Sequence, residues 1–345
     1  MGQETEISSL GEFGLIDHLT EGLESVNAGT ELGVGDDCAV LKGCGEKRRT
    51  LITTDLLLEG IHFDLSYVPL KHLGYKAAVV NFSDVYAMNG EPKQITVSLG
   101  ISSRFTLEHI EALYAGIRMA CERYGVDIVG GDTSASVTGL IISITCVGEC
   151  DADKVVRRSG ASDTDLICVS GDLGAAYMGL QLLEREREVS KAAGDKEFAP
   201  AFEGKEYLLE RQLKPEARRD VIEELRELGV VPTALMDVSD GLSSELLHIC
   251  KSSGVGCRIY ENRIPIDYQT AAMADEMNMN VFTAALNGGE DYELLFTVKL
   301  SDFEKVEHMK TARVIGRVTK KELGCCLVSP DEGEHELRAQ GWKAF

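Results

Sequence analysis

The stretches RRTLITTD (residues 48–55) and VDIVGGDTS (residues 126–134) decide the fold, because each is an apolar run that ends in a carboxylate. Such runs predict β-strands, and glycine or small hydroxyl residues at a strand end let a bulky anion approach the backbone. Three more acidic motifs follow apolar runs: GDDCAV at 35–40, NFSD at 81–84 and DVSDG at 237–241. Hard cations such as Mg²⁺ prefer oxygen ligands, so the five motifs together predict a multi-metal site.

Each acidic motif alone has a second interpretation. An Asp after a strand is more often a helix N-cap or a turn residue than a metal ligand. Five such motifs in one chain are hard to explain as turns alone. On the predicted helix 71–89, Asn81, Asp84 and Met88 fall at positions i, i+3 and i+7, so Asp84 shares a face with an otherwise apolar stripe. A carboxylate on such a face needs a partner or a metal.

Apolar periodicity predicts alternating strands and helices in the first part of the chain. The expected strands are 51–55, 95–101, 127–131 and 140–148, and the expected helices are 71–89 and 106–124. The runs ITVSLGI and LIISITCVG are apolar on both faces, which is typical of strands that are covered on both sides. We therefore expect an α/β unit here.

A polar stretch at 151–165, DADKVVRRSGASDTD, predicts the junction between two domains, 1–150 and 151–345. A second α/β unit follows it. Its expected elements are a strand in DLICVSG, a helix from about 174, a helix at 216–228, a strand at 233–238, a helix at 241–252 and a strand in YELLFTV. The charged segment between 185 and 206 predicts a solvated helix and loop without a catalytic role.

The composition narrows the class of protein. A chain of 345 residues with 44% hydrophobic residues can form two domains with real cores. A net charge of −22 without a basic stripe argues against a nucleic-acid partner. The N-terminus resembles no signal peptide and no stretch reaches the length of a membrane span, so we expect a cytoplasmic protein without a membrane partner. The ten cysteines form no CxxC pair, and we expect reduced, mostly buried thiols.

A nucleotide could not be held by a GxxxxGK[ST] loop, because the sequence contains none. Where carboxylates outnumber nearby bases, Mg²⁺ that bridges phosphate oxygens is the usual solution, since the protein alone would repel the ligand. The acidic motifs and the missing phosphate loop therefore point to the same metal-assisted chemistry.

In their order and spacing, the motifs of this chain resemble those of the thiamine-monophosphate kinases. The matching stretches are GEFGLI, GVGDDCAVL, TTDLLLEGIHF, NFSDVYAMNG, GGDTS, RRSGA, DVSDGL and NGGEDYELLFT. The wider superfamily, which includes aminoimidazole ribonucleotide synthetase and selenophosphate synthetase, shares the scattered acidic plan. The combination of EGIHF, NFSD and GGEDYEL favours the kinase, and the resemblance runs through nearly the whole chain.

The resemblance implies an enzyme that phosphorylates thiamine monophosphate to thiamine diphosphate with ATP, assisted by several Mg²⁺ ions and by K⁺. It also implies a two-domain α/β fold of the α+β type, like that of aminoimidazole ribonucleotide synthetase, whose N-terminal domains pair as a homodimer into a barrel-like sheet. An acceptor phosphate has a second pKa of about 6 and is ionised at neutral pH, so the transfer needs no dedicated catalytic base.

The resemblance assigns roles residue by residue. The implied metal ligands are Asp36, Thr53, Thr54, Asp55, Asp84, Asp132 and Asp237, with Asp240 as a further candidate. The implied ATP-binding residues are Tyr114, Gly131, Asp132, Arg158 and Ser239. The implied binding residues for the thiamine moiety are His62, Glu290 and Trp342. Asp37 is as easily a cap or a hydrogen-bond acceptor behind the ligands as a ligand itself.

Several of these residues have a structural alternative. Tyr114 at helical spacing is more often a core residue, and His62 beside an aromatic residue is often simply packed. Glu290 could cap a turn, and Trp342 could seal a domain face, although an aromatic plane suits the cationic thiazolium ring. Arg158 is preferred to Arg157 because it directly precedes SGA.

Two other functions stay open at this point. A sibling ATP-dependent synthetase would use similar carboxylates on another acceptor, but the chain lacks the glycine-rich N-terminal segment with a reactive Cys and the terminal Cys tail of those relatives. A noncatalytic module that only binds a nucleotide or thiamine phosphate would keep the motifs without turnover. No acidic motif in this chain is visibly broken, which favours the enzyme.

Overall fold

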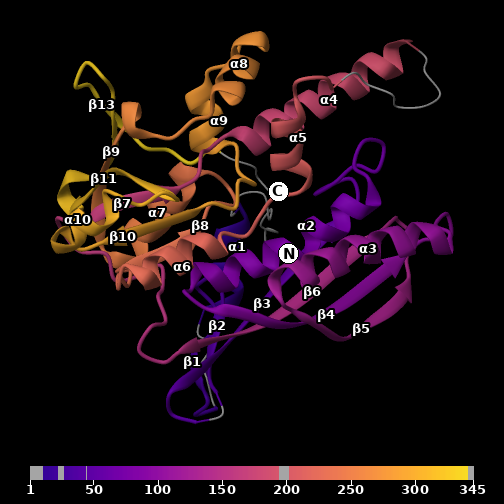
Figure 1. Ribbon diagram of the computed structural model, residues 1–345, viewed down its shortest axis with the longest axis horizontal. Helices are drawn as coiled ribbons and strands as arrows, with labels where there is room; N and C mark the ends of the chain where they lie inside the picture. Colours follow the sequence, from indigo (N-terminus) through magenta and orange to yellow (C-terminus); the bar gives the residue numbers. More distant parts are fainter. Residues whose placement is uncertain (1–10, 22–26, 44, 194–201, 341–345) are drawn as a thin grey trace, which may run out of the picture.

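Two mixed β-sheets, one in each half of the chain, organise the computed structural model, which describes residues 11–21, 27–43, 45–193 and 202–340 (Figure 1). The first sheet has the strand order β1-β2-β3-β6-β4-β5. Its strands are β1 (Thr30–Leu32), β2 (Ala39–Lys42), β3 (Arg48–Leu58), β4 (Glu91–Ile101), β5 (Asp127–Ala135) and β6 (Ile141–Asp151). Neighbouring strands are antiparallel except β4 and β5, which run parallel.

Helices α2 (Leu70–Ala87) and α3 (Leu107–Tyr124) lie side by side and cover one face of the first sheet (Figure 1). Most of α2 is buried, as expected for a helix with apolar residues on nearly all sides. A capping box between Thr106 and His109 begins α3, and Gly125 in the left-handed conformation (φ 71°) ends it.

The two helices cross in close backbone contact at two glycines. A Cβ atom on Gly74 would lie 1.9 Å from the carbonyl oxygen of Leu113, and a Cβ on Gly116 would lie 1.9 Å from that of Lys71. Only glycine fits at either position without moving a backbone. The crossing therefore fixes the height of α2 above the sheet, and with it the position of Asp84 near the end of the helix.

Strands β3, β4 and β6 alternate between buried and partly exposed side chains along their length. In β6 the buried positions include Ile142, Ile144 and Cys146, while the residues between them are only partly buried. In the single chain, only one face of these strands is thus fully buried. The apolar sequences ITVSLGI and LIISITCVG favour burial of both faces. Strand β5 forms one edge of the sheet and is exposed along its whole length.

The second sheet has the strand order β13-β12-β9-β11-β7-β10-β8. Its strands are β7 (Leu166–Ser170), β8 (Ala234–Asp237), β9 (Val255–Tyr260), β10 (Leu294–Val298), β11 (Ala312–Lys320), β12 (Cys325–Val328) and β13 (Glu334–Glu336). The only parallel pair among these described strands is β9 with β12. Strands β7 and β10 and the edge strand β8 are buried at every position, as expected for a sheet that is covered on both faces.

The remaining helices belong mostly to the second half, apart from α1 near the N-terminus. They are α1 (Gly11–Thr20), α4 (Ala175–Ala193), α5 (Glu206–Leu213), α6 (Arg219–Glu227), α7 (Leu242–Ser253), α8 (Tyr268–Glu276), α9 (Val281–Asn287) and α10 (Phe303–Val306). Single 3-10 turns span Glu261–Arg263, Leu300–Asp302 and Lys321–Leu323. Figure 1 shows α4 projecting away from the second sheet, and this helix confirms the helical part of the charged segment.

The predicted elements are present, with small differences at their ends. Strands β3, β4 and β6 are longer than predicted, and α2 and α3 match the predicted ranges within two residues. The predicted helix at 216–228 begins only at Arg219, because residues 214–218 form a connection. In this connection Glu216 accepts a hydrogen bond from Tyr124 of the first half, and Arg218 pairs with Glu293 next to the second sheet. A two-domain α/β fold with two mixed sheets is confirmed.

The two halves meet along α2. The Ser83 hydroxyl donates to Asp237 Oδ2 (2.5 Å), and Lys76 Nζ donates to the carbonyl oxygen of Gln212 (3.1 Å). The largest hydrophobic cluster contains side chains of both halves, including Phe82 and Phe296. Helix α2 therefore packs against both halves, and its residues Lys76 and Ser83 face the junction between them.

The nine cysteines in the described part of the chain are free thiols. Seven of them are buried and Cys325 and Cys326 are half-buried, as predicted, whereas Cys44 lies outside the described residues. None of the helices in the described ranges is both long enough and apolar enough to cross a membrane.

Candidate active site

A group of carboxylates gathers where α2 meets the second half of the chain. We call it the acidic cluster, and its members are Asp36, Asp37, Asp55, Asp84 and Asp237. Single carboxylate oxygens of Asp37, Asp84 and Asp237 lie within 4.8 Å of one another. They come from the loop before β2, from α2 and from the end of β8, while Asp55 lies in β3 under α2. The fold thus brings together four of the five acidic motifs.

Hydroxyl groups orient two members of the acidic cluster. Thr53 Oγ1 donates to Asp84 Oδ2 at 2.5 Å, and Ser83 Oγ donates to Asp237 Oδ2 at 2.5 Å. Other oxygens have no donor, since Asp37 Oδ2 and Asp55 Oδ2 are buried without a hydrogen-bond partner. Buried carboxylate oxygens without a partner are costly, and a bound cation would satisfy them.

Burial raises the pKa values of the whole acidic cluster. The pKa of Asp36 rises to about 6, because burial and then the charge of Asp37 disfavour its ionised form. Burial alone raises the pKa of Asp55 to about 6, and burial followed by the charge of Asp37 raises that of Asp237 to about 7. The pKa of Asp84 lies well above its ordinary value, from burial and then from the charge of Asp55. Such a cluster binds either protons or a cation.

Arg158 supplies positive charge to one side of the acidic cluster. Its Nη2 atom lies 2.5 Å from Asp37 Oδ1, and its backbone N–H lies 3.2 Å from Asp36 Oδ2. The Nε atom of Arg158 forms no hydrogen bond and lies 4.0 Å from Asp36 Oδ1, so the guanidinium faces both carboxylates of the GDD motif. The sequence left open whether Asp37 is a metal ligand, and in the structure Asp37 forms an ion pair with Arg158.

The DVSDG turn lies next to the acidic cluster and is held from two sides. The Asp240 backbone N–H donates to Glu245 Oε1 at 2.9 Å, and Ser239 Oγ lies 3.5 Å from the same oxygen. The carbonyl oxygen of Ser239 accepts the N–H of Glu290 at 2.7 Å. This bond joins the turn to the NGGEDYEL segment, and it brings Ser239, Asp240 and Glu290 to the same edge of the second half.

Glu290 is an ion-pair partner in the single chain. Its Oε1 atom lies 2.9 Å from Lys76 Nζ on α2, and its Oε2 atom accepts from Gln212 Nε2 at 2.9 Å. Burial, then the charge of Glu290 and then that of Asp55 raise the pKa of the neighbouring Tyr292 well above its ordinary value. The influence of Asp55 shows that Tyr292 lies close to the acidic cluster. Lys76, Gln212 and Tyr292 had no role in the sequence prediction.

Three predicted site residues lie on the other face of the first sheet or at its edge. Thr54 alternates with Thr53 along β3, so its side chain is on the face away from α2, where its hydroxyl donates to the carbonyl oxygen of Ile144 at 3.1 Å. Gly131 and Asp132 lie in the exposed edge strand β5, where Asp132 Oδ1 accepts from the Thr133 N–H. Within one chain, the fold does not bring these three residues to the acidic cluster.

The other predicted residues are spread more widely. Tyr114 lies in the middle of α3 and packs, partly buried, against the main hydrophobic cluster. His62 is exposed in the loop after β3, where its Nδ1 accepts from the Leu58 N–H at 3.0 Å. Trp342 lies outside the described residues.

A second group of buried charges lies behind the NGGEDYEL segment, and no sequence pattern predicted it. We call it the arginine network: Arg211, Arg218, Asp172, Asp291 and Glu293. Arg211 Nη2 lies 3.1 Å from Glu293 Oε1, and Arg218 Nη1 pairs with Glu293 Oε2. Asp291 accepts the N–H groups of Gly174 (2.7 Å) and Ala176 (3.2 Å). Burial raises the pKa of Asp291 to about 7, while Arg211 and these N–H groups oppose the rise.

The arginine network fixes a strained loop. Gly289, Glu290 and Tyr292 all have positive φ values, of 71°, 59° and 50°. The two non-glycine residues pay a backbone cost of about 1–2 kcal/mol each, which persists only where the surroundings impose it. Buried Asp291 and Glu293 supply that constraint from either side of Tyr292.

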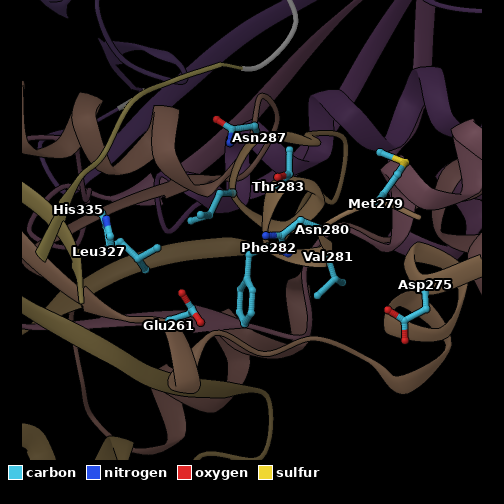
Figure 2. A pocket seen from close by; sticks show the side chains of 11 residues that line it. Glu261, Asp275, Met279, Asn280, Val281, Phe282, Thr283, Asn287, Leu327 and His335 are labelled. Atoms are coloured by element: carbon cyan, nitrogen blue, oxygen red, sulfur yellow. Dashed lines mark hydrogen bonds between the residues drawn. The ribbon is translucent and has the colours of Figure 1, made fainter. Parts of the chain in front are cut away.

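A pocket lies elsewhere, between α9 and the strands β12 and β13 (Figure 2). It has a volume of about 590 Å³, and Figure 2 shows Glu261, Phe282, Leu327 and His335 around it. None of the sequence-predicted site residues in the described part of the chain lines it, and none of its lining side chains has a buried polar atom without a partner. The chemical evidence therefore favours the acidic cluster over this pocket as the active site.

Comparison with known proteins agrees with this architecture. Residues 35–150 match the family of AIR synthase related proteins in its N-terminal domain, and residues 166–325 match the C-terminal domain of the same family. The chain therefore belongs to the class of two-domain AIR synthase-related proteins, whose two domains correspond to the two sheets described above.

Full-length relatives narrow the class further. The chain is 38% identical over 339 residues to thiamine-monophosphate kinase of Aquifex aeolicus, covering 98% of this chain and 99% of the relative, and 31% identical to that of Bacillus subtilis, covering 97% and 100%. The solved structure of AaThiL complexed with AMPPCP and TMP superposes with a TM-score of 0.84 at 35% identity over 100% of both chains. The chain belongs to the thiamine-monophosphate kinase family.

Proposed function

We propose that this protein transfers the γ-phosphoryl group of ATP to thiamine monophosphate, giving thiamine diphosphate and ADP. The observation that carries the proposal is the acidic cluster, which has two buried oxygens without partners, in a chain that matches thiamine-monophosphate kinases over almost its full length. In this reaction an oxygen of the acceptor phosphate bonds to the γ-phosphorus, and the bond from that phosphorus to the bridging oxygen of ADP breaks. No proton has to be removed from the acceptor, which is ionised at neutral pH.

Mg²⁺ fits the acidic cluster. The donors are hard carboxylate oxygens, two of them buried without partners, and we infer that Asp36, Asp55, Asp84 and Asp237 hold the ions, with Asp240 at the neighbouring turn. Bound Mg²⁺ would offset the repulsion between two phosphate anions and stabilise charge on the transferring group. K⁺ stays a further expected helper, to be tested separately.

The side chains of the protein would position the reactants. Thr53 and Ser83 hold Asp84 and Asp237 by short hydrogen bonds, so these carboxylates do not have to reorganise during the transfer. Arg158 pairs with Asp37 and opposes the rise of its pKa, and its guanidinium is a candidate for contact with a phosphate oxygen of ATP. Ser239 lies at the adjacent turn and is a second candidate for contact with ATP.

The thiamine moiety would lie near Glu290. This carboxylate is one-third exposed and suits a cationic thiazolium ring or an aminopyrimidine, and Lys76 and Gln212 hold it in place. Exposed His62 and the aromatic Trp342 stay further candidates for substrate contact. Tyr114 stays a candidate for ATP.

A homodimer would explain the residues that one chain leaves apart. Strand β5 offers an exposed edge, and the uncovered face of the first sheet is only partly buried. If two first sheets close into a barrel, Thr54, Gly131 and Asp132 would face the partner, and the partner's copy could bring Asp132 to the nucleotide. A cytoplasmic location and the division into domains 1–150 and 151–345 stay predictions.

The proposal is tested by incubating purified protein with ATP, Mg²⁺ and thiamine monophosphate and measuring thiamine diphosphate and ADP together by chromatography. Equal formation of the two products is expected, and omission of thiamine monophosphate should stop ADP formation. ADP without thiamine diphosphate would move the chain to a sibling synthetase with another acceptor. ATP binding without any turnover would indicate a noncatalytic module.

A further inference from the structure

We propose that Cys250, Cys257 and Cys325 form a binding site for one Zn²⁺ ion in the second half of the chain, separate from the acidic cluster. One sulfur atom from each residue takes part, and the three sulfur atoms lie within 4.8 Å of one another. The residues come from α7, β9 and β12, so the site depends on the tertiary fold and has no local sequence signature.

The geometry suits a thiolate-bound metal. Zn²⁺ binds cysteine at about 2.3 Å, which places sulfur atoms about 3.8 Å apart in a tetrahedral site. The three thiols are within about 1 Å of that spacing, a difference that small side-chain rotations can remove. Soft and borderline d¹⁰ cations prefer such sulfur ligands, whereas Mg²⁺ prefers the oxygens of the acidic cluster.

The backbone holds the three thiols in place. Cys257 and Cys325 are direct partners in the parallel pair β9–β12, and the Cys257 N–H donates to the carbonyl oxygen of Gly324 at 3.1 Å. Cys250 lies in the last turns of α7, which leads directly into β9 through Gly254. Since the strands and the helix fix all three Cα positions, binding needs little rearrangement.

The surroundings allow a fourth ligand. Cys250 and Cys257 are buried within the second hydrophobic cluster, against side chains such as Ile249 and Leu337. Cys325 is only half-buried, so solvent reaches the site from its side. Three protein ligands with one position left for water make a common coordination of Zn²⁺.

The site would fasten one end of the second sheet. Strands β12 and β13 contain four and three residues and form the edge of that sheet, joined to the rest through β9 alone. An ion bound to α7, β9 and β12 together would hold this edge onto the domain. Removal of the zinc ion should therefore lower the Tm of the protein, while the arrangement of the acidic cluster stays the same.

The test uses the purified, reduced full-length protein, loaded with Zn²⁺ in excess Mg²⁺ so that the carboxylates are occupied, and then desalted. One equivalent of zinc is expected by elemental analysis, with protection of these three cysteines from alkylation in peptide mass spectra. Replacement by Co²⁺ should give a thiolate-to-cobalt charge-transfer band, which carboxylate ligands cannot produce.

Cys325→Ser should abolish the cobalt band and lower the zinc content at least tenfold, while the matched control Cys326→Ser, at the adjacent half-buried thiol, should keep both. Absence of the band in the wild-type protein would overturn the proposal, and this result does not depend on how any variant folds. Loss of the band in Cys326→Ser as well, unchanged zinc in Cys325→Ser, or a disulfide among the three residues in the reduced protein would also overturn it.

Discussion

Two groups of buried carboxylates in this protein differ in how the chain compensates their charge. In the arginine network, Glu293 meets two guanidinium groups and a serine hydroxyl, and Asp291 meets Arg211 and two backbone N–H groups. In the acidic cluster, Asp84 has a hydroxyl donor and a like-charged neighbour in Asp55. Both groups contain buried carboxylates, since Asp237 and Asp291 are each 3% exposed.

The difference separates a structural role from a binding role. A buried charge that the chain neutralises contributes to one fixed conformation, and removal of its partner is strongly destabilising. A buried charge that the chain leaves without a partner weakens the free protein and becomes favourable only when a ligand arrives. The arginine network holds the loop at Glu290, and we propose that the acidic cluster binds a cation. Four experiments test this distinction between a structural and a binding role.

The largest effect is expected for Asp84→Asn. The substitution removes the central charge of the acidic cluster, while an amide oxygen can still accept from Thr53, so the fold should stay intact. We expect the rate of thiamine diphosphate formation to fall by about 10³-fold or more, which corresponds to ~4 kcal/mol of transition-state stabilisation. Steady-state kinetics measure the loss of activity, and circular dichroism tests whether the fold is intact. Near wild-type activity would remove the metal assignment.

Arg211→Met should instead destabilise the fold. It leaves Asp291 and Glu293 with less compensation in a buried site, which costs about 3–4 kcal/mol of unfolding free energy. Urea unfolding monitored by circular dichroism measures the change. The matched control is Arg185→Met, because Arg185 forms a more exposed pair with Glu276 and should change stability by less than about 1 kcal/mol. Equal effects in the two variants would contradict the distinction.

The effect of Mg²⁺ on thermal stability should depend on pH. The folded-state pKa values of Asp36, Asp55 and Asp237, about 6, 6 and 7, exceed the ordinary value, so the metal-free protein loses stability as pH rises from about 4 to about 7. Mg²⁺ replaces the lost protons, and saturating ion should add about 2–3 kcal/mol at pH 8 but much less at pH 5.5.

Differential scanning fluorimetry at the two pH values, with and without Mg²⁺ and in the absence of ATP, measures this dependence. Asp84→Asn serves as the control and should reduce the Mg²⁺ effect at pH 8. A Tm increase of the same size at both pH values would show that the ion binds away from the titrating carboxylates.

The smallest effect is expected for Ser83→Ala, which removes the hydroxyl that donates to Asp237. A single hydrogen bond to a buried carboxylate contributes about 1–2 kcal/mol, and the variant should keep measurable activity with weaker Mg²⁺ binding. Titration of activity against Mg²⁺ concentration reveals this change. Ser136→Ala, at a partly buried loop serine away from the acidic cluster, is the control, and a Mg²⁺ dependence identical to wild type in both variants would deny Ser83 an orienting role.

The sequence predicted most elements and the centre of the site, because both depend on local patterns. Helical spacing placed Asp84 on a buried face, and a strand end located Asp237, whereas Asp55 lies inside β3, which continues to Leu58. Strand alternation alone could also have separated Thr53 from Thr54, since neighbouring residues point to opposite faces.

Other features depend on contacts between distant segments. Arg211 and Arg218 lie in a charged stretch typical of a solvated helix, and they are buried only because α5 and the following connection pack against Asp291 and Glu293. Ser83 gains its role from the meeting of α2 with β8, and Lys76 from the meeting of α2 with the Glu290 loop. No periodicity within one element encodes such pairs.

The crossing of α2 and α3 at Gly74 and Gly116 has a consequence for how this enzyme family can vary. A methyl group at either position would collide with a backbone carbonyl of the facing helix, and a second substitution cannot relieve a clash with backbone atoms. Because α2 also carries Lys76, Ser83 and Asp84, any separation of the helices displaces groups on both sides of the domain junction. In a library of random single substitutions, these two glycines should therefore behave like catalytic positions, with no tolerated replacement, although neither touches a reactant.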